Sequence, residues 1–397
     1  MNNKDITVYV AMSGGVDSSV VAGLIQEAGY NTIGVTMCFN ITHNDGRASC
    51  CGVDGIADAK RAADILGLPH YVFNFAGDIN DYIIDNFTDE YLSGRTPNPC
   101  VRCNQHLKFG TLYQKVRAMG ADHLATGHYA KIEFDAEREC HVLRKAADPR
   151  KDQSYFLYSM KKETLPSVMF PLGGLTKPQV RELARRFGLN TAEKPESQDI
   201  CFVPASGYKK FIEDRVGAQA MTPGPFVDDT GKVIGRHKGL AHYTIGQRDK
   251  LGLALGYPVY VTRMDRAANS VHIGNLRQLY SGGLKAGGLN WLAGKIPQET
   301  IEVNARIRYN SPEAKAHLTP LEGDGVRVEF HEPQKSVTPG QSVVFYDGDL
   351  VLGGAIIDEA LPCPEGEINY ENASSPAIIN DCGTVVFRPD GQSGAPV

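Results

Sequence analysis

The chain has 397 residues, which at roughly 150 residues per domain favours two to three domains, each large enough to bury its own core. Hydrophobic residues make up 42% and charged residues 22% of the sequence, and these ordinary globular values exclude a wholly disordered chain and a fibrous repeat. The 41 basic and 46 acidic residues give a formal net charge of −5, so a polyanion must bind a local basic face rather than the field of the whole molecule.

The sequence carries no signal for a membrane or for secretion. No apolar run reaches the roughly eighteen residues that cross a bilayer, and no signal-peptide pattern precedes the first predicted strand. We therefore expect a cytoplasmic protein with no membrane partner. The nine cysteines then predict catalytic, redox or metal-binding thiols rather than a disulfide scaffold.

Strand and helix patterns alternate along the chain up to about residue 205. The successive runs are Ile6–Met12, Val16–Ile25, Thr32–Cys38, Asp54–Leu66 and His70–Phe75, followed by helices at Asp78–Leu92 and Leu107–Met119 with a strand after them at His123–Thr126. This alternation predicts an α/β domain over residues 1–205, with a Rossmann-like, doubly wound parallel sheet and helices on both faces.

Two smaller units are predicted after this domain. Residues 206–284 carry many turn residues and short alternating runs, which we interpret as a small mixed domain. Strand-like runs at 303–309, 325–330, 342–346 and 351–357 predict a C-terminal β-barrel over residues 285–360, with a hairpin signal at Asp347-Gly348. Residues 361–397, with five prolines, predict a tail of undefined order.

A glycine-rich loop, Ser13-Gly14-Gly15-Val16-Asp17-Ser18-Ser19, lies between the first predicted strand and the first predicted helix. Its glycines let backbone amides approach an oxyanion, and the helix N-terminus and serine hydroxyls add donors, so the loop predicts phosphate binding. Neither a Walker ending nor a dinucleotide-binding glycine pattern is present. Asp17 is an acid inside a phosphate site, which predicts a Mg²⁺ ion that bridges it to a nucleotide.

Two cysteines stand in settings that favour reactivity. Cys103 lies near the N-terminus of a predicted helix, with Arg102 and Lys108 close in sequence, and such a setting lowers the pKa of a thiol. Cys201 follows much later, in the run Ser197–Phe202. This separation is compatible with two thiols at one pocket, but the spacing alone does not bring them together.

The glycine loop resembles the pyrophosphatase loop of ATP enzymes that cleave between the α and β phosphates, a class with an adenine nucleotide alpha hydrolase-like fold. Together with further motifs, in order from Met12 to about Ile357, it makes the chain similar to the tRNA-specific 2-thiouridylase family. The other matching stretches are Asn98–Phe109, Gly127–Ala130, Lys151–Leu157, Ser197–Phe202, Gly246–Arg248 and Thr338–Gln341.

The resemblance implies a transferase that adenylates the C2 oxygen of the wobble uridine in certain tRNAs and replaces it with sulfur carried as a persulfide on Cys201. Cys103 is then the nucleophile that completes sulfur release, leaving a Cys103–Cys201 disulfide to be reduced in each cycle. The implied partners are tRNA and a sulfur-donor protein, either a persulfide relay or a cysteine desulfurase. The implied ATP-binding residues are Ala11, Met12, Ser13, Gly14, Gly15, Val16, Asp17, Ser18, Met37 and Gly127.

The resemblance also implies where the RNA lies, and it makes residues 206–284 a tRNA-recognition domain. The implied contacts to the target base are Asn98, Pro99 and Cys100. The implied contacts to the rest of the tRNA are His128, Lys151, Asp152, Gln153, Arg308, Tyr309 and Gln341. By contrast, we interpret Arg181, Arg185 and Arg186 as the solvent-exposed face of the helix after Thr176.

One departure from the family leaves other hypotheses open. Many members carry an aspartate with an acid/base role where this chain has Cys100, which cannot simply inherit that role. With Cys103 and Cys201 it offers three thiolates, a set that suits a [4Fe–4S] cluster with one open iron, whereas zinc would need His106 or His128 as a fourth ligand. Two further hypotheses are another pyrophosphatase-loop synthetase, such as an amide-forming one, and a non-catalytic nucleotide-dependent RNA binder.

Overall fold

The computed structural model describes residues 2–41, 53–194, 200–363, 378–379 and 385–386. Ser197–Asp199 of the second cysteine motif and most of the predicted tail lie outside these residues. Within the tail, the short strands β18 (Ile378–Ile379) and β19 (Val385–Val386) pair with each other. No helix of the described residues is long and apolar enough to span a bilayer.

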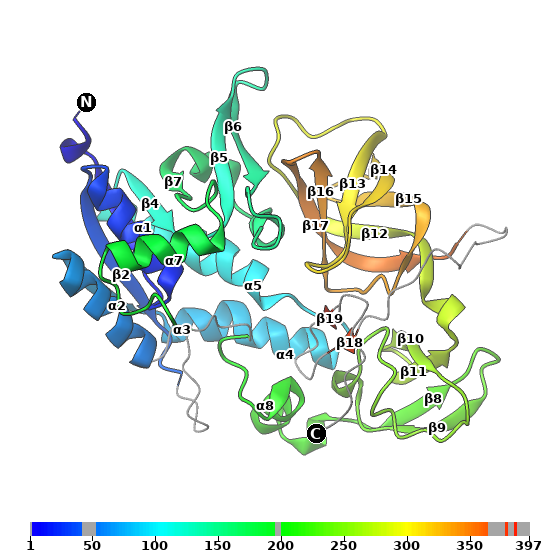
Figure 1. Ribbon diagram of the computed structural model, residues 1–397. Helices are drawn as coiled ribbons and strands as arrows, with labels where there is room; N and C mark the ends of the chain where they lie inside the picture. Colours follow the sequence, from blue (N-terminus) through cyan, green and yellow to red (C-terminus); the bar gives the residue numbers. More distant parts are fainter. Residues whose placement is uncertain (1, 42–52, 195–199, 364–377, 380–384, 387–397) are drawn as a thin grey trace.

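The N-terminal part of the chain forms the predicted parallel sheet. Its strands are β1 (Thr7–Ala11), β2 (Asn31–Cys38), β3 (His70–Asn74), β4 (His123–Thr126) and β7 (Val168–Met169), in the spatial order β3-β2-β1-β4-β7. On one face, alternate β1 residues such as Val8 pack with α1 (Val16–Glu27), α2 (Val53–Leu66) and α7 (Lys177–Arg186). Tyr9 packs on the opposite face with helices from residues 76–118. The doubly wound α/β fold is therefore confirmed (Figure 1).

The helices on the second face run in two stretches. The first consists of α3 (Ala76–Ile79), η2 (Asn80–Ile84) and α4 (Asp85–Leu92), and the second of α5 (Pro99–Arg102), η3 (Cys103–Leu112) and α6 (Tyr113–Ala118). The second stretch begins at Pro99 rather than at Leu107, because the Asn98 side chain caps it by accepting a hydrogen bond from the Val101 amide at 3.3 Å.

The C-terminal strands form the predicted barrel. They are β12 (Tyr280–Trp291), β13 (Ile301–Arg306), β14 (Ala314–Pro320), β15 (Val326–Lys335), β16 (Ser342–Asp347) and β17 (Leu350–Leu361). Pairing of β12 with both β15 and β17 closes the six strands on themselves, and the predicted hairpin joins β16 to β17. β12 was missed because its many glycines give no β-branched or aromatic alternation.

The hairpin of β5 (Ala130–Asp135) and β6 (Cys140–Lys145) was not predicted. It leaves the α/β domain directly after β4, and β6 pairs with β17 at Arg144 and Leu350, so two strands from the first part of the chain extend the barrel sheet. The two units are therefore joined by backbone pairing between β6 and β17.

A small mixed sheet lies between the two larger units in sequence. Its strands are β8 (Gly224–Val227), β9 (Val233–His237), β10 (Tyr260–Asp265) and β11 (Ser270–Gly274), in the order β10-β11-β8-β9, and α8 (Gly207–Val216) precedes them. The sheet has its own apolar cluster around Phe226 and Val261. Short 3₁₀ segments complete the described chain: η1 (Asn3–Asp5), η4 (Ser154–Phe156), η5 (Lys162–Ser167), η6 (Ala218–Ala220), η7 (Leu240–His242) and η8 (Leu276–Leu279).

The turn before β16 holds the loop that leads to Asn98. The Gln341 amide Nε2 donates to the carbonyl oxygens of Thr96 at 2.9 Å and Pro97 at 3.3 Å, and the Thr96 amide donates to the Pro339 carbonyl at 2.9 Å. Gln341, predicted to contact tRNA, therefore uses its amide nitrogen to fasten this loop to the barrel.

Gly340 lies at the centre of this contact. Its φ of +91° disfavours any side chain, and a Cβ at this position would lie 2.9 Å from both the amide nitrogen and the carbonyl oxygen of Thr96. Gly348 in the β16–β17 hairpin also has a positive φ, +60°, but a Cβ there would meet nothing within 4 Å. The two glycines thus share the backbone constraint and differ in packing.

We predict that Gly340→Ala destabilises the protein by about 2–4 kcal/mol, from left-handed strain plus displacement of the Thr96 backbone. Gly348→Ala is the matched control and should cost about 1 kcal/mol, because only the strain applies. Urea unfolding followed by circular dichroism measures both. Equal losses in the two variants would show that contact with Thr96 contributes nothing.

Candidate functional site

The glycine-rich loop joins β1 to α1 at the carboxyl edge of the parallel sheet. The Ser18 hydroxyl accepts a hydrogen bond from the Ser13 amide at 3.1 Å and lies 3.2 Å from the Gly15 carbonyl oxygen, to which Ser19 also donates at 2.9 Å. Gly15 is the N-cap of α1 and provides no side-chain cap, so the first amides of the helix are not capped by a side chain. This is the arrangement in which a helix N-terminus binds phosphate.

At two glycines of the site, Gly14 and Gly127, the neighbouring backbone leaves no room for a side chain. Gly14 has a φ of +74°, and a Cβ there would lie 2.2 Å from the Gly55 carbonyl oxygen of α2. A Cβ on Gly127, after β4, would lie 2.9 Å from the Ser18 amide nitrogen. The structure thus brings Gly127 against the predicted loop. Met12 and Met37 are both buried, Met12 in the apolar cluster that contains α1 and Met37 in the cluster on the opposite face of the sheet, so both have packing roles.

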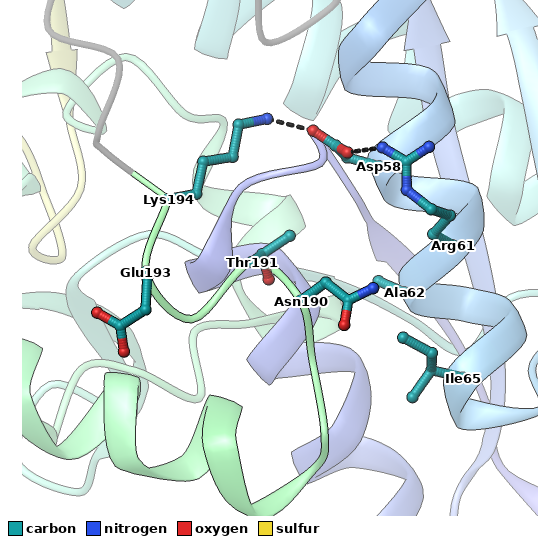
Figure 2. A pocket seen from close by; sticks show the side chains of 8 residues that line it. All are labelled: Asp58, Arg61, Ala62, Ile65, Asn190, Thr191, Glu193 and Lys194. Atoms are coloured by element: carbon teal, nitrogen blue, oxygen red, sulfur yellow. Dashed lines mark hydrogen bonds and ion pairs between the residues drawn. The ribbon is translucent and has the colours of Figure 1, made fainter.

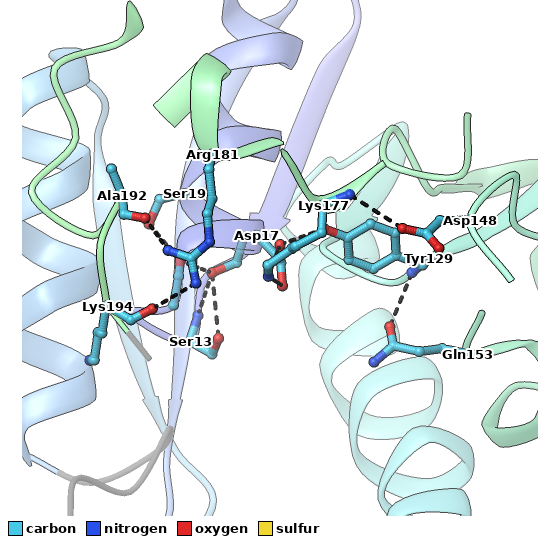
Figure 3. A network of polar contacts seen from close by, with 12 residues as sticks. Ser13, Asp17, Ser19, Tyr129, Asp148, Gln153, Lys177, Arg181, Ala192 and Lys194 are labelled. Atoms are coloured by element: carbon cyan, nitrogen blue, oxygen red, sulfur yellow. Dashed lines mark hydrogen bonds and ion pairs between the residues drawn. The ribbon is translucent and has the colours of Figure 1, made fainter. Parts of the chain in front are cut away.

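Asp17 is held by two side chains that the sequence analysis did not single out (Figure 3). The Lys177 ammonium donates to both carboxylate oxygens of Asp17, at 2.8 and 2.9 Å, and the Tyr129 hydroxyl donates to one of them at 2.8 Å. Lys177 is the first residue of α7 and is only 8% exposed. The protein itself therefore neutralises the acid in the loop. The one sequence signal that could have identified Lys177 as a site residue is its position at the start of a helix.

The segment after α7 is fastened to the same loop, because Lys194 donates to the Gly14 carbonyl oxygen at 3.3 Å. Lys194 also forms an ion pair with Asp58, which in turn pairs with Arg61 (Figure 2). Burial would raise the pKa of Asp58, but hydrogen bonds and charges from Lys194 and Arg61 outweigh it and lower the pKa. Beside these residues is a pocket of about 310 Å³, lined by Asp58, Arg61, Ala62, Ile65, Asn190, Thr191, Glu193 and Lys194.

Arg181 corrects the interpretation of α7 as a wholly solvated basic face. It is half-buried and donates to the carbonyl oxygens of Ala192 and Lys194, because the chain after α7 folds back along the helix (Figure 3). Arg185 and Arg186 are exposed as expected, and each pairs with a surface glutamate.

His128 is buried in a polar and aromatic setting. Its Nδ1 lies 2.6 Å from the Thr126 hydroxyl and its Nε2 lies 3.3 Å from the Lys108 ammonium, while Phe109 and Phe170 pack against the ring. Burial, followed by the charge of Lys108, lowers the pKa of His128 well below its usual value. The ring is therefore neutral at pH 7, with Nε2 as an acceptor from Lys108.

The predicted RNA contacts near residue 152 are engaged within the protein. Asp152 is buried and accepts from the Ala146 amide at 2.9 Å and the Ser154 hydroxyl at 2.7 Å, and it lies 3.8 Å from the Arg306 guanidinium of the barrel. Gln153 exchanges two hydrogen bonds with the Tyr129 backbone. Lys151 is half-buried.

Arg308 and Tyr309 lie at the end of the barrel that faces residues 152–160. The Arg308 guanidinium donates to the Ser336 carbonyl and the Thr338 hydroxyl, and burial, partly offset by Tyr155, lowers its pKa to about 10. The Tyr309 ring lies 4.5 Å from the Phe156 ring centroid. Arg308 therefore holds the turn after β15 within the barrel, and Tyr309 packs at the junction between the α/β domain and the barrel.

The predicted reactive cysteines lie on one apolar cluster. Cys103 and Cys201 are both half-buried and pack against the core that contains Val101 and Phe202, whereas Cys100 is exposed. Among the described residues, no three His, Cys, Asp or Glu side chains are grouped so as to hold a metal ion. The structure thus does not assemble the three thiols into a cluster site, nor a zinc site with His106 or His128.

Three family models match consecutive parts of the chain. They are a tRNA methyl transferase HUP domain at residues 6–205, a PRC-barrel domain of the same group at residues 209–275, and an aminomethyltransferase β-barrel domain at residues 281–357. A curated relative from Geobacter metallireducens, named tRNA-specific 2-thiouridylase MnmA, is 49% identical over 360 residues, which cover 89% of this chain and 97% of that one. The chain belongs to the tRNA-specific 2-thiouridylase family.

Other members of this family show the same level of similarity. The MnmA protein of Halothermothrix orenii is 47% identical over 355 residues, covering 89% of this chain and 99% of its own length. Among solved structures, the U34-tRNA thiolase NcsA from Methanococcus maripaludis has a TM-score of 0.30 at 22% identity, covering 54% of this chain and 66% of that one. This TM-score is too low to add to the assignment.

We predict that Lys177→Met destabilises the protein by about 1–3 kcal/mol, because it leaves the Asp17 carboxylate without its ammonium partner in a mostly buried site. Adding Asp17→Asn should recover most of the loss, since the unpaired charge is then gone. Urea unfolding of the single and double variants measures this coupling. Arg186→Ala, which breaks the exposed pair with Glu27, is the control and should change stability by less than about 0.5 kcal/mol.

The lowered pKa of His128 predicts a pH dependence of stability. The unfolded chain binds a proton at this histidine below about pH 6.5, while the folded state resists it, so stability falls as the pH drops below that value. His128→Gln should reduce the slope between pH 6.5 and 5 by up to about 1.4 kcal/mol per pH unit. Urea midpoints across this range test it, and an unchanged slope would contradict a neutral buried ring.

Proposed function

We propose that this protein is an ATP-dependent tRNA-uridine 2-sulfurtransferase that converts the wobble uridine of its tRNA substrates to 2-thiouridine. The observation that carries the proposal is the N-terminus of α1, which has no side-chain cap and lies within the loop Ser13–Ser18. The relatives of this chain are named tRNA-specific 2-thiouridylases. A polyphosphate suits this position because the helix amides and the glycine backbone offer donors to its oxygens.

In the first step, the C2 oxygen of the uridine attacks the α-phosphorus of ATP. The bond from this phosphorus to the α,β-bridging oxygen breaks, pyrophosphate leaves, and the base carries AMP on O2. The base carbonyl oxygen is a poor leaving group, and AMP turns it into a good one. We assign Ser13, Gly14, Gly15 and Ser18 to the phosphates, because donors already in place stabilise the departing charge without reorganisation.

Asp17 and Lys177 set the charge of the phosphate site. An unpaired carboxylate would repel pyrophosphate, and the Lys177 ammonium cancels that repulsion. A Mg²⁺ ion bound with the nucleotide would add further charge neutralisation, and Asp17 is the loop carboxylate that would hold it. Ala11, Met12, Val16, Met37 and Gly127 would line the nucleotide site.

In the second step, the terminal sulfur of a Cys201 persulfide attacks C2, and AMP leaves with the former O2. The Cys103 thiolate then attacks Sγ of Cys201, which breaks the Cys201–sulfur bond and leaves the sulfur on the base. The two cysteines end as a disulfide, and an external thiol must reduce it before a sulfur-donor protein restores the persulfide. Both thiols are half-buried at the edge of the same large apolar core, which is compatible with this pairing. Because the cycle needs reduced thiols, we also propose a cytoplasmic location.

For the RNA, we propose that Asn98, Pro99 and Cys100 contact the target base. Asn98 caps its helix and the loop before it is fastened to the barrel, so this segment is pre-organised. Lys151 and Tyr309, which are half-buried, would contact the tRNA directly, whereas His128, buried with both ring nitrogens beside protein groups, would act by shaping the site. Asp152, Gln153, Arg308 and Gln341 would act mainly by holding the surrounding segments in shape, since their polar atoms bind protein groups.

We predict that Cys201→Ser abolishes 2-thiouridine formation while ATP binding stays intact, because only the sulfur carrier is lost. The assay incubates unmodified tRNA, ATP, Mg²⁺ and a sulfur donor, then detects 2-thiouridine by mass spectrometry of the digested RNA. Cys140→Ser, in the β5–β6 hairpin, is the matched control and should remain active.

The same assay separates the other hypotheses. Pyrophosphate release without thiolation by the wild-type protein would favour another synthetase, and tRNA and ATP binding without pyrophosphate release would favour a non-catalytic binder. Thiolation by an anaerobically purified, iron-free protein would exclude the cluster, and activity in Cys201→Ser would reject the persulfide carrier.

A further inference from the structure

Two π-helical segments lie side by side on the face of the sheet opposite α1. They are η2 (Asn80–Ile84) and η3 (Cys103–Leu112), which contact each other. π-helical turns are rare and are often found at functional sites, because they distort the regular helix. The proposed reaction uses Cys103 at the start of η3, but it gives no role to η2 or to the place where the two segments meet.

An aromatic pair stands at this meeting point. The Tyr82 ring of η2 is stacked on the His106 ring of η3, with the ring centroids 5.3 Å apart and an angle of 7° between the planes. Tyr82 is 43% exposed, and His106 is half-buried beneath it. Because Tyr82 is exposed while its inner face is stacked on His106, its outer face is a surface suited to another flat ring.

The stack is tied to the segment that carries the proposed nucleophile. The Arg102 guanidinium Nε donates to the Tyr82 carbonyl oxygen at 3.0 Å, which fastens η2 to the end of α5. Arg102 directly precedes Cys103, and His106 follows in the same helical segment. The rings are therefore held in a fixed relation to Cys103 and to the loop at Asn98–Cys100.

The charge around the stack is favourable for RNA. Burial, and then the positive charges of Arg102 and Lys161, lowers the pKa of His106, so its ring is neutral at pH 7 with two cations close by. Lys161 is exposed. Of the acids on the Tyr82 side, Asp85 is paired with Arg215, while Asp81 is exposed directly before Tyr82 in η2. A neutral aromatic face beside cations is the combination that binds single-stranded nucleic acids, by stacking a base and contacting the backbone.

We propose that Tyr82 and His106 form a stacking platform for a tRNA base that flanks the target uridine, with Lys161 beside it for the RNA backbone. This inference rests on the proposed function, since it concerns the same RNA. Holding a neighbouring base on the platform would keep the anticodon loop splayed while the target base enters the site at Asn98–Cys100. The platform thus adds a positioning element that none of the assigned RNA contacts supplies.

The test uses the full-length protein and an anticodon stem-loop RNA with 2-aminopurine next to the target uridine, on either side in turn. With the wild-type protein, stacking should quench the fluorescence of one of the two probes. Tyr82→Ala should remove this quenching and weaken RNA binding by about 5- to 30-fold, as expected for the loss of one base–aromatic stack. His106→Ala should act in the same direction.

Salt dependence distinguishes stacking from charge. Tyr82→Ala removes no charge, so its plot of log affinity against log salt should run parallel to that of the wild-type protein. Lys161→Ala should instead reduce the slope by about 0.7, the value for one phosphate contact to a single strand. Tyr82→Phe keeps the ring and should retain both affinity and quenching.

Tyr71→Ala is the matched control. Tyr71 is 46% exposed, close to the value for Tyr82, but it lies on the edge strand β3 outside both π-helical segments. Its variant should bind the RNA as the wild-type protein does. Circular dichroism and melting curves of all variants confirm that they fold.

Unchanged affinity and quenching in folded Tyr82→Ala would overturn the inference, as would equal losses in Tyr82→Phe. Intact RNA binding combined with slower sulfur delivery from the donor protein would also overturn it, because the surface would then serve that protein. If the wild-type protein neither binds nor thiolates the RNA, the proposed function fails instead. The two failures are thus distinguishable.

Discussion

The hydrogen bonds that Asp17 accepts from Lys177 and Tyr129 are the interaction on which the site depends. A loop built to bind phosphate carries an acid, and that acid is compatible with a polyanion only when a cation balances it. The interaction draws together α1, the chain after β4 and the first residue of α7. Tyr129 is in turn fixed by Gln153, so the charge balance of the loop is built into the fold rather than added by one flexible side chain.

A continuous set of polar contacts runs from this loop to the barrel. Gln153 follows Asp152, whose buried carboxylate faces Arg306 of β13. A second junction holds the loop before Asn98 through Gln341, and a third is the pairing of β6 with β17. The barrel is therefore more than an appended RNA-binding unit, because it supports both the segment next to Tyr129 and the segment next to Cys103.

The helical stretch that carries Cys103 departs from regular α-helix where the chemistry is proposed. Its start is set locally by the Asn98 cap and Pro99, and its continuation is the π-helical η3, which packs against η2. Such a distortion is costly unless surrounding packing supports it, and here Leu107 and Leu112 of η3 are completely buried. Beside this anchored stretch, Cys100 and the Tyr82 ring stacked on His106 remain exposed.

The sequence by itself determined the α/β alternation, the phosphate loop, the β16–β17 hairpin and the family, because these depend on neighbouring residues or on motifs read in order. Only the tertiary structure decided that Lys177 neutralises Asp17, that the β5–β6 hairpin extends the barrel, and that Arg308 and Gln341 bind protein carbonyls. Each of these contacts joins residues far apart in the chain. The residue types of Lys177, Arg308 and Gln341 would fit a solvated or an RNA-bound role equally well. The partner of a charged side chain is set by long-range packing, which no local pattern encodes.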